Sequence, residues 1–191
     1  MLFLISYSLF TGPLIRDSEF LISDSEHEDP FPNMMIRPFA RDDVAAILAI
    51  QVQCPHAAQW RIDDYLRLAD DPYGMVLVAQ VAAKSGPEVV GFAAFCRVID
   101  EAELRNLAVE PAHQRQGIAR ALLAEGSGKL GEYGVRRIFL EVRASNRAAL
   151  GVYTSLGFRL LSTRKDYYQN PVEDALVMAL DITVPSQVPS Q

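Results

Sequence analysis

The chain has 191 residues, half of them hydrophobic, which is enough for one domain with a core of its own. It carries 18 basic and 24 acidic residues, of which one basic and six acidic residues lie in residues 1–34. The rest is nearly neutral, so overall charge indicates neither a nucleic-acid-binding surface nor a membrane-binding one. Cys54 and Cys96 lack the spacing of a metal site or a CxxC motif, so we expect no metal centre.

The two ends of the chain differ in composition from its middle. Residues 1–34 are apolar at first, without the pattern of a signal peptide or the length of a membrane anchor, and then acidic. We expect a disordered extension there, and a disordered tail at residues 183–191, where VPSQ is repeated. Residues 35–182 are expected to form the folded domain.

The folded region alternates between strand and helix patterns. The expected strands are Met35–Pro38, Met75–Ala83, Val89–Ile99, Glu103–Val109, Arg136–Val142, Phe158–Ser162 and Ala175–Leu180. The expected helices are Arg41–Gln53, Arg61–Ala69, one that begins near Gln114, and Asn146–Leu156. The segment Ser85–Pro87 marks a hairpin between the second and third strands. This alternation predicts an α/β fold with a mixed sheet flanked by helices.

The segment Asn106–Arg120, NLAVEPAHQRQGIAR, has the pattern of a strand, a turn at Pro111 and the start of a helix. The first turn of a helix has unpaired N–H groups and partial positive charge, which suits a phosphate group. An ordinary turn is the alternative, because Q-x-x-G-x-A matches neither of the common nucleotide-binding glycine motifs. The candidate phosphate-binding residues are Arg115, Gln116, Gly117, Ile118, Ala119 and Arg120.

Two glycines interrupt the helix that follows this turn. Gly126 and Gly128 lie in the segment EGSGK, and each costs about 1 kcal/mol relative to alanine inside a helix. We expect the helix to be frayed or bent at this point.

Three later residues are candidates for chemistry, each with a structural alternative. Glu141 lies in a strand and can be either a proton acceptor or a surface glutamate. Tyr153 lies in a helix beside Leu150 and Leu156, a spacing that favours a core aromatic. Asn146 has the position of an N-cap for the same helix.

Together these segments resemble the GNAT superfamily of acetyl-CoA-dependent N-acetyltransferases and, within it, the ribosomal-protein-alanine N-acetyltransferases. The resemblance runs over 35–182 and rests on VIDEAELRNLAVEPAHQRQGIARALL, LEVRASNRAALGVYTSLGF, RKDYY and EDALVMAL. It implies a centrally splayed sheet of six to seven strands. It also implies that the pantetheine arm of acetyl-CoA pairs with the strand that contains Leu107, Ala108 and Val109, and that Asn146 contacts the cofactor.

The resemblance assigns roles to the candidate residues. Glu141 falls on the family's proton acceptor and Tyr153 on its general acid. Tyr167 and Tyr168 match a tyrosine pair near the acceptor, with packing at a strand edge as the alternative. Trp60 also aligns, although Gln59 precedes it where the family usually has proline.

The expected activity is transfer of acetyl from acetyl-CoA, by direct attack of the amine on the thioester, to the N-terminal alanine of a ribosomal protein. Acetylation of a small-molecule amine or a lysine is the alternative, and a catalytically idle CoA-binding adaptor is a third possibility. An α-amine is the easier acceptor, because its pKa lies about 2.5 units below that of lysine, or roughly 3.4 kcal/mol. Asp100 and Glu101 would attract the charged N-terminus. We expect a cytoplasmic protein without direct contacts to nucleic acid or membrane.

Overall fold

The computed structural model describes residues 34–84 and 86–182. The extension expected before Met34 and the tail expected at residues 183–191 lie outside the described residues. Met34 itself opens the first strand and pairs with Val81, so the folded domain includes one residue more than expected.

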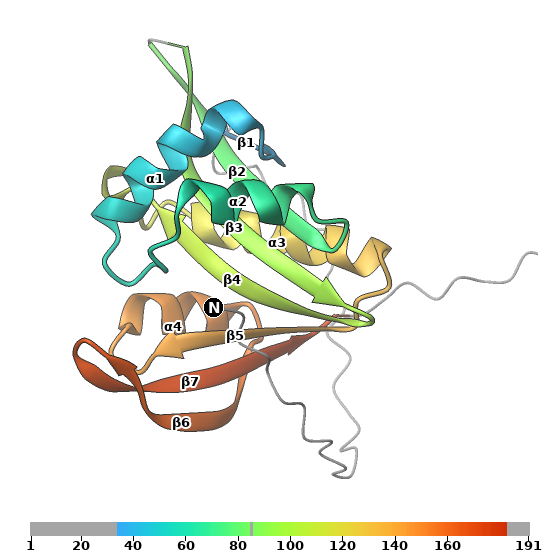
Figure 1. Ribbon diagram of the computed structural model, residues 1–191, viewed down its shortest axis with the longest axis vertical. Helices are drawn as coiled ribbons and strands as arrows, with labels where there is room; N and C mark the ends of the chain where they lie inside the picture. Colours follow the sequence, from blue (N-terminus) through green and yellow to red (C-terminus); the bar gives the residue numbers. More distant parts are fainter. Residues whose placement is uncertain (1–33, 85, 183–191) are drawn as a thin grey trace, which may run out of the picture. The chain divides into compact units, whose positions relative to one another are not determined.

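Seven strands form one mixed sheet (Figure 1). They are β1 (Met34–Pro38), β2 (Gly74–Ala83), β3 (Gly86–Val98), β4 (Glu101–Val109), β5 (Arg137–Arg143), β6 (Arg159–Gln169) and β7 (Val172–Asp181). Their order is β1-β2-β3-β4-β5-β7-β6. Only β4 and β5 pair in parallel, and every other neighbouring pair in the described sheet is antiparallel. The parallel pair therefore lies in the middle of the sheet, which is mixed and has seven strands, as predicted.

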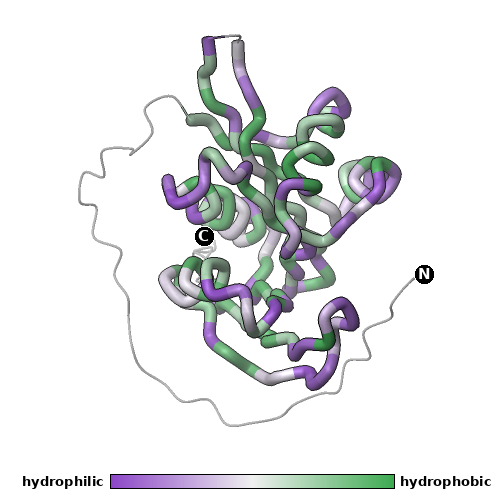
Figure 2. Tube along the Cα trace, turned by 90° about the vertical axis from the view of Figure 1, so that its left-hand side faces the viewer, coloured by the Kyte–Doolittle hydropathy of each residue, from purple (hydrophilic) through white to green (hydrophobic). Residues whose placement is uncertain are grey.

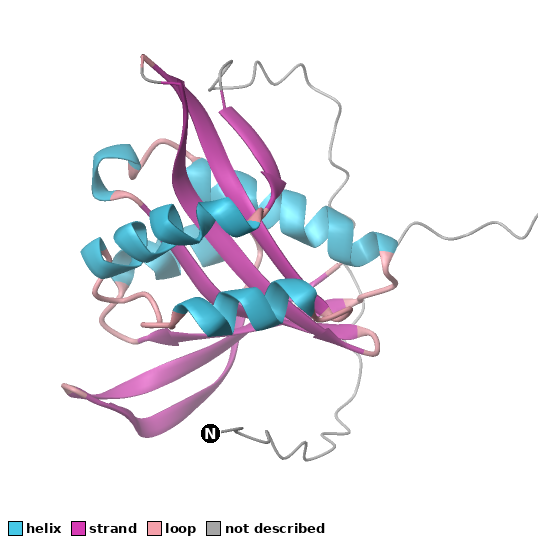
Figure 3. Ribbon diagram, turned by 45° about the horizontal axis from the view of Figure 1, so that its top comes forward, coloured by secondary structure: helices cyan, strands magenta, loops and turns pink. Residues whose placement is uncertain are grey.

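Helices cover both faces of the sheet, as Figure 3 shows. They are α1 (Val44–Gln53), α2 (Ile62–Asp70), α3 (Ile118–Glu132) and α4 (Arg147–Ser155). Alternate residues of β2 serve the two faces: Val76 and Val78 pack with α1 and α2, whereas Leu77 and Ala79 pack with α3. In Figure 2 the chain is hydrophobic mainly where the central strands run between the helices. None of the helices described is long and apolar enough to cross a membrane.

Several expected boundaries were wrong. β4 begins at Glu101 instead of Glu103, and α3 begins at Ile118 instead of Gln114. The largest difference is β6, which continues to Gln169 instead of ending at Ser162. All but one of its residues are exposed and the remaining one is half-buried, although the strand pairs with β7, so it needs no apolar pattern to form.

The helix α3 is continuous through both of its suspect glycines, so the expected break is absent. A Cβ atom at Gly126 would lie 2.6 Å from two carbons of the buried Phe95 ring, whereas one at Gly128 would meet nothing within 4 Å. Gly126 thus lets α3 approach β3 closely, and the packing compensates for its low helix propensity. The structure gives no corresponding reason for Gly128.

The two parallel strands separate along their length. Glu101–Leu104 of β4 pair with Arg137–Leu140 of β5, and no pairing between these strands follows Leu104 in the described sheet. On the other side of β4 the register shifts by one residue at Arg105, because Leu104 pairs with Phe95 and Asn106 with Ala94. This bulge turns Asn106 toward α1 and α2. The divergence confirms the predicted central splay.

Candidate active site

The turn before α3 has the backbone that a bound phosphate requires. Gly117 is the N-cap of α3 with a φ of 84°, a left-handed conformation that glycine adopts without strain. No side chain of the described residues caps this helix, so the amides of its first turn, from Ile118 onward, are available to an anion. The side chain of Ile118 is buried and fixes the helix start to the core.

Charged and polar side chains surround this turn. Arg115 and Gln116 are exposed on the turn. Arg120 lies in the first turn of α3, and its guanidinium is 3.4 Å from the Ser155 hydroxyl of α4. This contact links α3 to α4 across the divergence of β4 and β5. The predicted phosphate-binding residues are therefore clustered, and their contact with a cofactor stays a prediction.

Asn146 begins the second helix beside the divergence. Its side-chain oxygen accepts a hydrogen bond from the Ala149 amide at 3.1 Å, which confirms the predicted N-cap of α4. The cap uses the oxygen and leaves the side-chain NH₂ group as a donor. The predicted cofactor contact of Asn146 is compatible with this arrangement.

The edge of β4 that faces the divergence carries Leu107, Ala108 and Val109. These residues pair with β3 on one side only. The Val109 carbonyl already accepts hydrogen bonds from the Gln114 side chain at 2.9 Å and the Cys54 thiol at 3.3 Å. A ligand strand along this edge must therefore use other main-chain groups of these residues.

Glu141 lies on β5, one residue beyond the last residue paired with β4. Its Oε1 is 2.8 Å from Nη1 of Arg164 on β6, and its side chain is only 19% exposed. Burial and the adjacent Glu141 carboxylate raise the pKa of Tyr167 to about 12. Glu141 therefore lies in a polar cluster with one cation and one neutral phenol, which a surface glutamate does not have.

A bulge in β6 creates this cluster. The register with β7 shifts between Arg164, which pairs with Ala175, and Tyr168, which pairs with Glu173. Asp174 holds the bulge, because its carboxylate accepts from the Asp166 amide at 3.1 Å and lies 2.6 Å from the Lys165 ammonium. The bulge directs Tyr167 toward Glu141. Sequence reasoning missed Arg164, and its only signal was the quoted segment RKDYY.

Tyr153 is buried in the core beside Phe158, with 5.6 Å between ring centroids. The core position favoured by its spacing is therefore present. Burial, with a smaller contribution from Tyr168, raises the pKa of the Tyr153 phenol, so it stays protonated. Such a phenol can donate a hydrogen bond to a nearby anion, and its role as general acid stays a prediction.

A second carboxylate near Glu141 was not among the candidates. Glu103 lies on β4, one residue before Leu104, which is the last residue of this strand that pairs with β5. Partial burial raises the pKa of Glu103, with Arg105 opposing and Glu141 adding to the shift. In the sequence Glu103 was identified only as the first residue of an expected strand.

The loop between α1 and α2 is fixed to β4 by neutral hydrogen bonds. Asn106 donates to the Ala58 carbonyl at 2.9 Å and to the Tyr65 hydroxyl at 2.8 Å. The Tyr65 hydroxyl in turn donates to Gln51 at 2.7 Å, and the Gln51 side chain also binds the backbone of Trp60. The loop that carries Trp60 is therefore held against the strand that lines the divergence.

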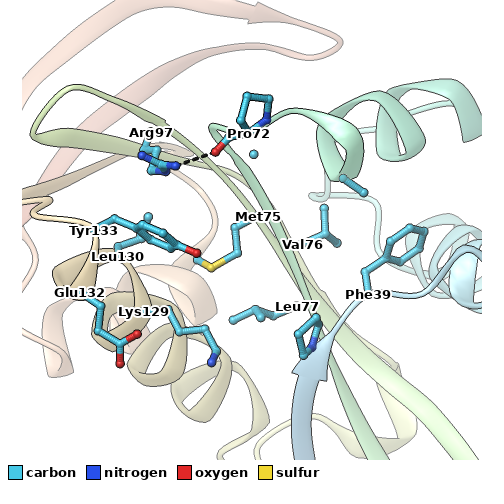
Figure 4. A pocket seen from close by; sticks show the side chains of 13 residues that line it. Phe39, Pro72, Met75, Val76, Leu77, Arg97, Lys129, Leu130, Glu132 and Tyr133 are labelled. Atoms are coloured by element: carbon cyan, nitrogen blue, oxygen red, sulfur yellow. Dashed lines mark hydrogen bonds between the residues drawn. The ribbon is translucent and has the colours of Figure 1, made fainter.

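Two other regions lie apart from this site. Asp100 and Glu101 lie at the β3–β4 turn and the start of β4, at the opposite end of the strand from Gly117. The pocket in Figure 4 is lined by the start of β2 and the end of α3, where Arg97 donates to the Pro72 carbonyl at 2.6 Å beside Tyr133. Neither Glu141 nor Gly117 lines this pocket.

Comparison with known proteins agrees with this arrangement. The profile of the Acetyltransferase (GNAT) family matches residues 41–158. The [ribosomal protein bS18]-alanine N-acetyltransferase of Escherichia coli (strain K12) is 46% identical over 99 residues, which are 51% of this chain and 67% of that protein.

Solved structures share the fold. The ribosomal-protein-S18-alanine N-acetyltransferase from Escherichia coli superposes with a TM-score of 0.69 at 33% identity, over 83% of this chain and 99% of that one. The structure of yncA from Salmonella typhimurium with its cofactor acetyl-CoA superposes with a TM-score of 0.67 at 23% identity, over 81% of this chain and 96% of that one. With the matched profile, the splayed sheet and the glycine turn before α3, the chain belongs to the GNAT family of acetyltransferases.

Proposed function

We propose that this enzyme transfers acetyl from acetyl-CoA to the free N-terminal α-amine of a protein, an alanine at the N-terminus of a ribosomal protein. The observation that carries the proposal is the identity with the Escherichia coli enzyme named for that reaction. The site is compatible with it, because Glu141 is placed beside the open edge of β4 with one cation and one phenol around it.

The residues present fit acetyl-CoA as the donor. The uncapped amides of α3, with Gly117 and the guanidinium groups of Arg115 and Arg120, suit a pyrophosphate. The open edge of β4 at Leu107–Val109 suits the amide groups of a pantetheine arm. When bound there, acetyl-CoA supplies an activated acyl group as a thioester.

Side chains of this protein would then accept and donate the protons of the reaction. Glu141, which is ion-paired with Arg164, accepts a proton from the incoming amine. Tyr153, kept protonated by burial, donates a hydrogen bond toward the leaving sulfur. Asn146 holds α4, and thereby Tyr153, in place.

The cofactor assignment is tested by adding charge at the closest backbone approach. Gly117→Glu should abolish acetyl-CoA binding in calorimetry, because bulk and negative charge replace the space for a phosphate. Gly128→Glu adds the same charge to an open position of the same helix and should leave affinity unchanged. The φ of residue 117 is strained for most side chains, and asparagine tolerates it better than most. Gly117→Asn therefore tests whether a side chain at this position by itself disturbs the fold. Unchanged affinity in a folded Gly117→Glu variant would refute this phosphate site.

The acceptor is tested with peptides. Peptides with a free N-terminal alanine should be acetylated at the α-amine, and the same peptides with a blocked N-terminus and an internal lysine should react little. Mass spectrometry locates the added group. Acetyl found mainly on lysine or on polyamines would favour the alternative acceptors.

A further inference from the structure

Two exposed tyrosines, Tyr73 before β2 and Tyr133 at the C-terminus of α3, are fixed by one arginine. The guanidinium carbon of Arg97 on β3 lies 4.4 Å from the centroid of the Tyr133 ring and 5.1 Å from that of Tyr73. Its Nη2 also donates to the Pro72 carbonyl. Each tyrosine nevertheless exposes more than half of its surface. Tyr73, Arg97 and Tyr133 thus form a preformed aromatic surface, which we call the tyrosine surface.

The pocket in Figure 4 continues the tyrosine surface. Arg97 and Tyr133 line it together with Met75 and Leu130, and its volume is about 320 Å³. The side chains of Tyr133 and Met75 point toward one another in Figure 4. This volume is at the lower end of the range for ligand pockets, so it suits small apolar groups.

The charged groups of the pocket do not favour an ionic ligand. Lys129 is already paired with Glu125, with 3.1 Å between ammonium and carboxylate. Glu132 also lines the pocket and adds one negative charge to the positive charge of Arg97. An uncharged segment would leave these existing contacts intact.

The last described residue, Ile182, lies near the tyrosine surface. Its amide donates to the Arg136 carbonyl at 2.7 Å, and the Arg136 amide donates to the Asp100 carbonyl of the β3–β4 turn at 2.7 Å. A Cβ atom at Gly131 would lie 3.6 Å from Cγ2 of Ile182. Residues 183–191 therefore begin beside the last turn of α3, which also carries Tyr133.

The sequence of residues 183–191, TVPSQVPSQ, favours an extended segment. It has no charged side chain and two Val-Pro pairs, and proline restricts both itself and the residue before it to extended conformations. A polyproline II helix rises 3.1 Å per residue, so this segment can span about 28 Å. That is more than twice the diameter of an α-helix, about 10–12 Å. The segment is long enough to pass the end of α3 and reach the pocket.

The period of a polyproline II helix places apolar side chains together. With three residues per turn, Pro185 and Val188 lie on one face. The backbone makes no internal hydrogen bonds, so its carbonyl groups can accept from the tyrosine hydroxyls and from Arg97. Proline-rich segments bind aromatic-lined grooves in this way.

We propose that residues 183–191 of this chain bind the tyrosine surface, with Pro185 and Val188 against Tyr133 and the pocket beside it. Composition by itself predicts a disordered tail, and the tyrosine surface offers the contacts that such a segment lacks alone. Neither Glu141 nor Gly117 lines the pocket, so the inference is independent of the proposed function.

The test is nitrogen-15 relaxation of the full chain in solution. Backbone order parameters of Ser186, Gln187 and Val188 should lie above about 0.6 and approach the rigid value of about 0.85. Values below about 0.6 in the wild type would overturn the proposal.

Two variants should release the segment. Tyr133→Ser removes one ring of the tyrosine surface, and Val188→Ser changes the segment while the surface stays intact. Each should lower the three order parameters to below about 0.6 and leave those of the core strands unchanged. Leu161→Ser on β6 is the matched control, because Leu161 is as exposed as Tyr73 but lies on the opposite edge strand. Order parameters that stay high in Val188→Ser, or in a folded Tyr133→Ser variant, would contradict the assignment.

Dilution distinguishes the segment of the same chain from that of a second copy. Order parameters that do not change on tenfold dilution would support binding within one chain. A fall on dilution, with a matching fall in the mass measured by sedimentation, would overturn it in favour of exchange between copies.

Discussion

The two halves of the sheet differ in the burial of their side chains and in their polar interactions. Strands β2–β4, with α1, α2 and α3, contain most of the buried side chains, and a neutral hydrogen-bond network around Asn106 lies among them. Strands β5–β7 form a thinner half in which β6 is exposed nearly throughout and the polar groups are charged. The first half contains most of the core, and the second carries the charged cluster of Glu141 and Arg164. Substitutions in the two halves should therefore affect different measurements.

The largest effect is expected at Glu141. Glu141→Gln should reduce turnover of the alanine peptide by about 10²- to 10⁴-fold, because the proposed proton acceptor is lost. Its ion pair with Arg164 is partly exposed, so the free energy of unfolding should change by less than about 1 kcal/mol. Glu125→Gln removes another ion-paired glutamate, on α3, and should leave turnover unchanged. A loss of stability without a loss of turnover at Glu141 would contradict the division between the halves.

A smaller effect on a different quantity is expected at Asn106. Asn106→Ala leaves the Ala58 backbone and the Tyr65 hydroxyl short of partners, which should cost about 1–3 kcal/mol of stability in urea denaturation. The KM for the peptide should also rise, because the loop with Trp60 loses its attachment to β4. His56→Ala in the same loop is exposed and serves as the control. Equal stability of the two variants would show that the network is not what fixes the loop.

Gly126→Ala tests side-chain packing in the first half of the sheet. The added methyl carbon would lie 2.6 Å from the Phe95 ring, so overpacking should cost about 1–3 kcal/mol, less roughly 1 kcal/mol of gained helix propensity. The melting temperature should fall, and kcat per folded molecule should stay constant. A rise in melting temperature would show that α3 can move away from β3 at little cost.

The smallest effect, a gain in stability, is expected at Gly128, two residues further along α3. Gly128→Ala meets nothing within 4 Å, so it should stabilise the enzyme by roughly 0.5–1 kcal/mol through helix propensity alone. The measurement is the same thermal denaturation, with Gly126→Ala as the matched partner. Destabilisation by Gly128→Ala would mean that the glycine has a role that the structure does not reveal.

Patterns local in sequence were predicted well. The strand and helix order, the N-cap at Asn146 and the glycine turn at Gly117 depend on residues within one turn or one strand of each other. The expected end of β6 at Ser162 was wrong because an exposed edge strand has no apolar period to detect. The expected break in α3 was wrong because Gly126 is compensated by Phe95, which is 31 positions away in sequence.

The sequence by itself determined the family, the order of the elements and the carboxylate of Glu141 as a candidate, since each depends on short motifs or periodicity. Only the tertiary structure decided what surrounds that carboxylate. Arg164 reaches it through a bulge in β6, and Glu103 approaches it from β4. The physical reason is that strand register and bulges bring these groups together, and register is set by pairing between segments that no local pattern connects.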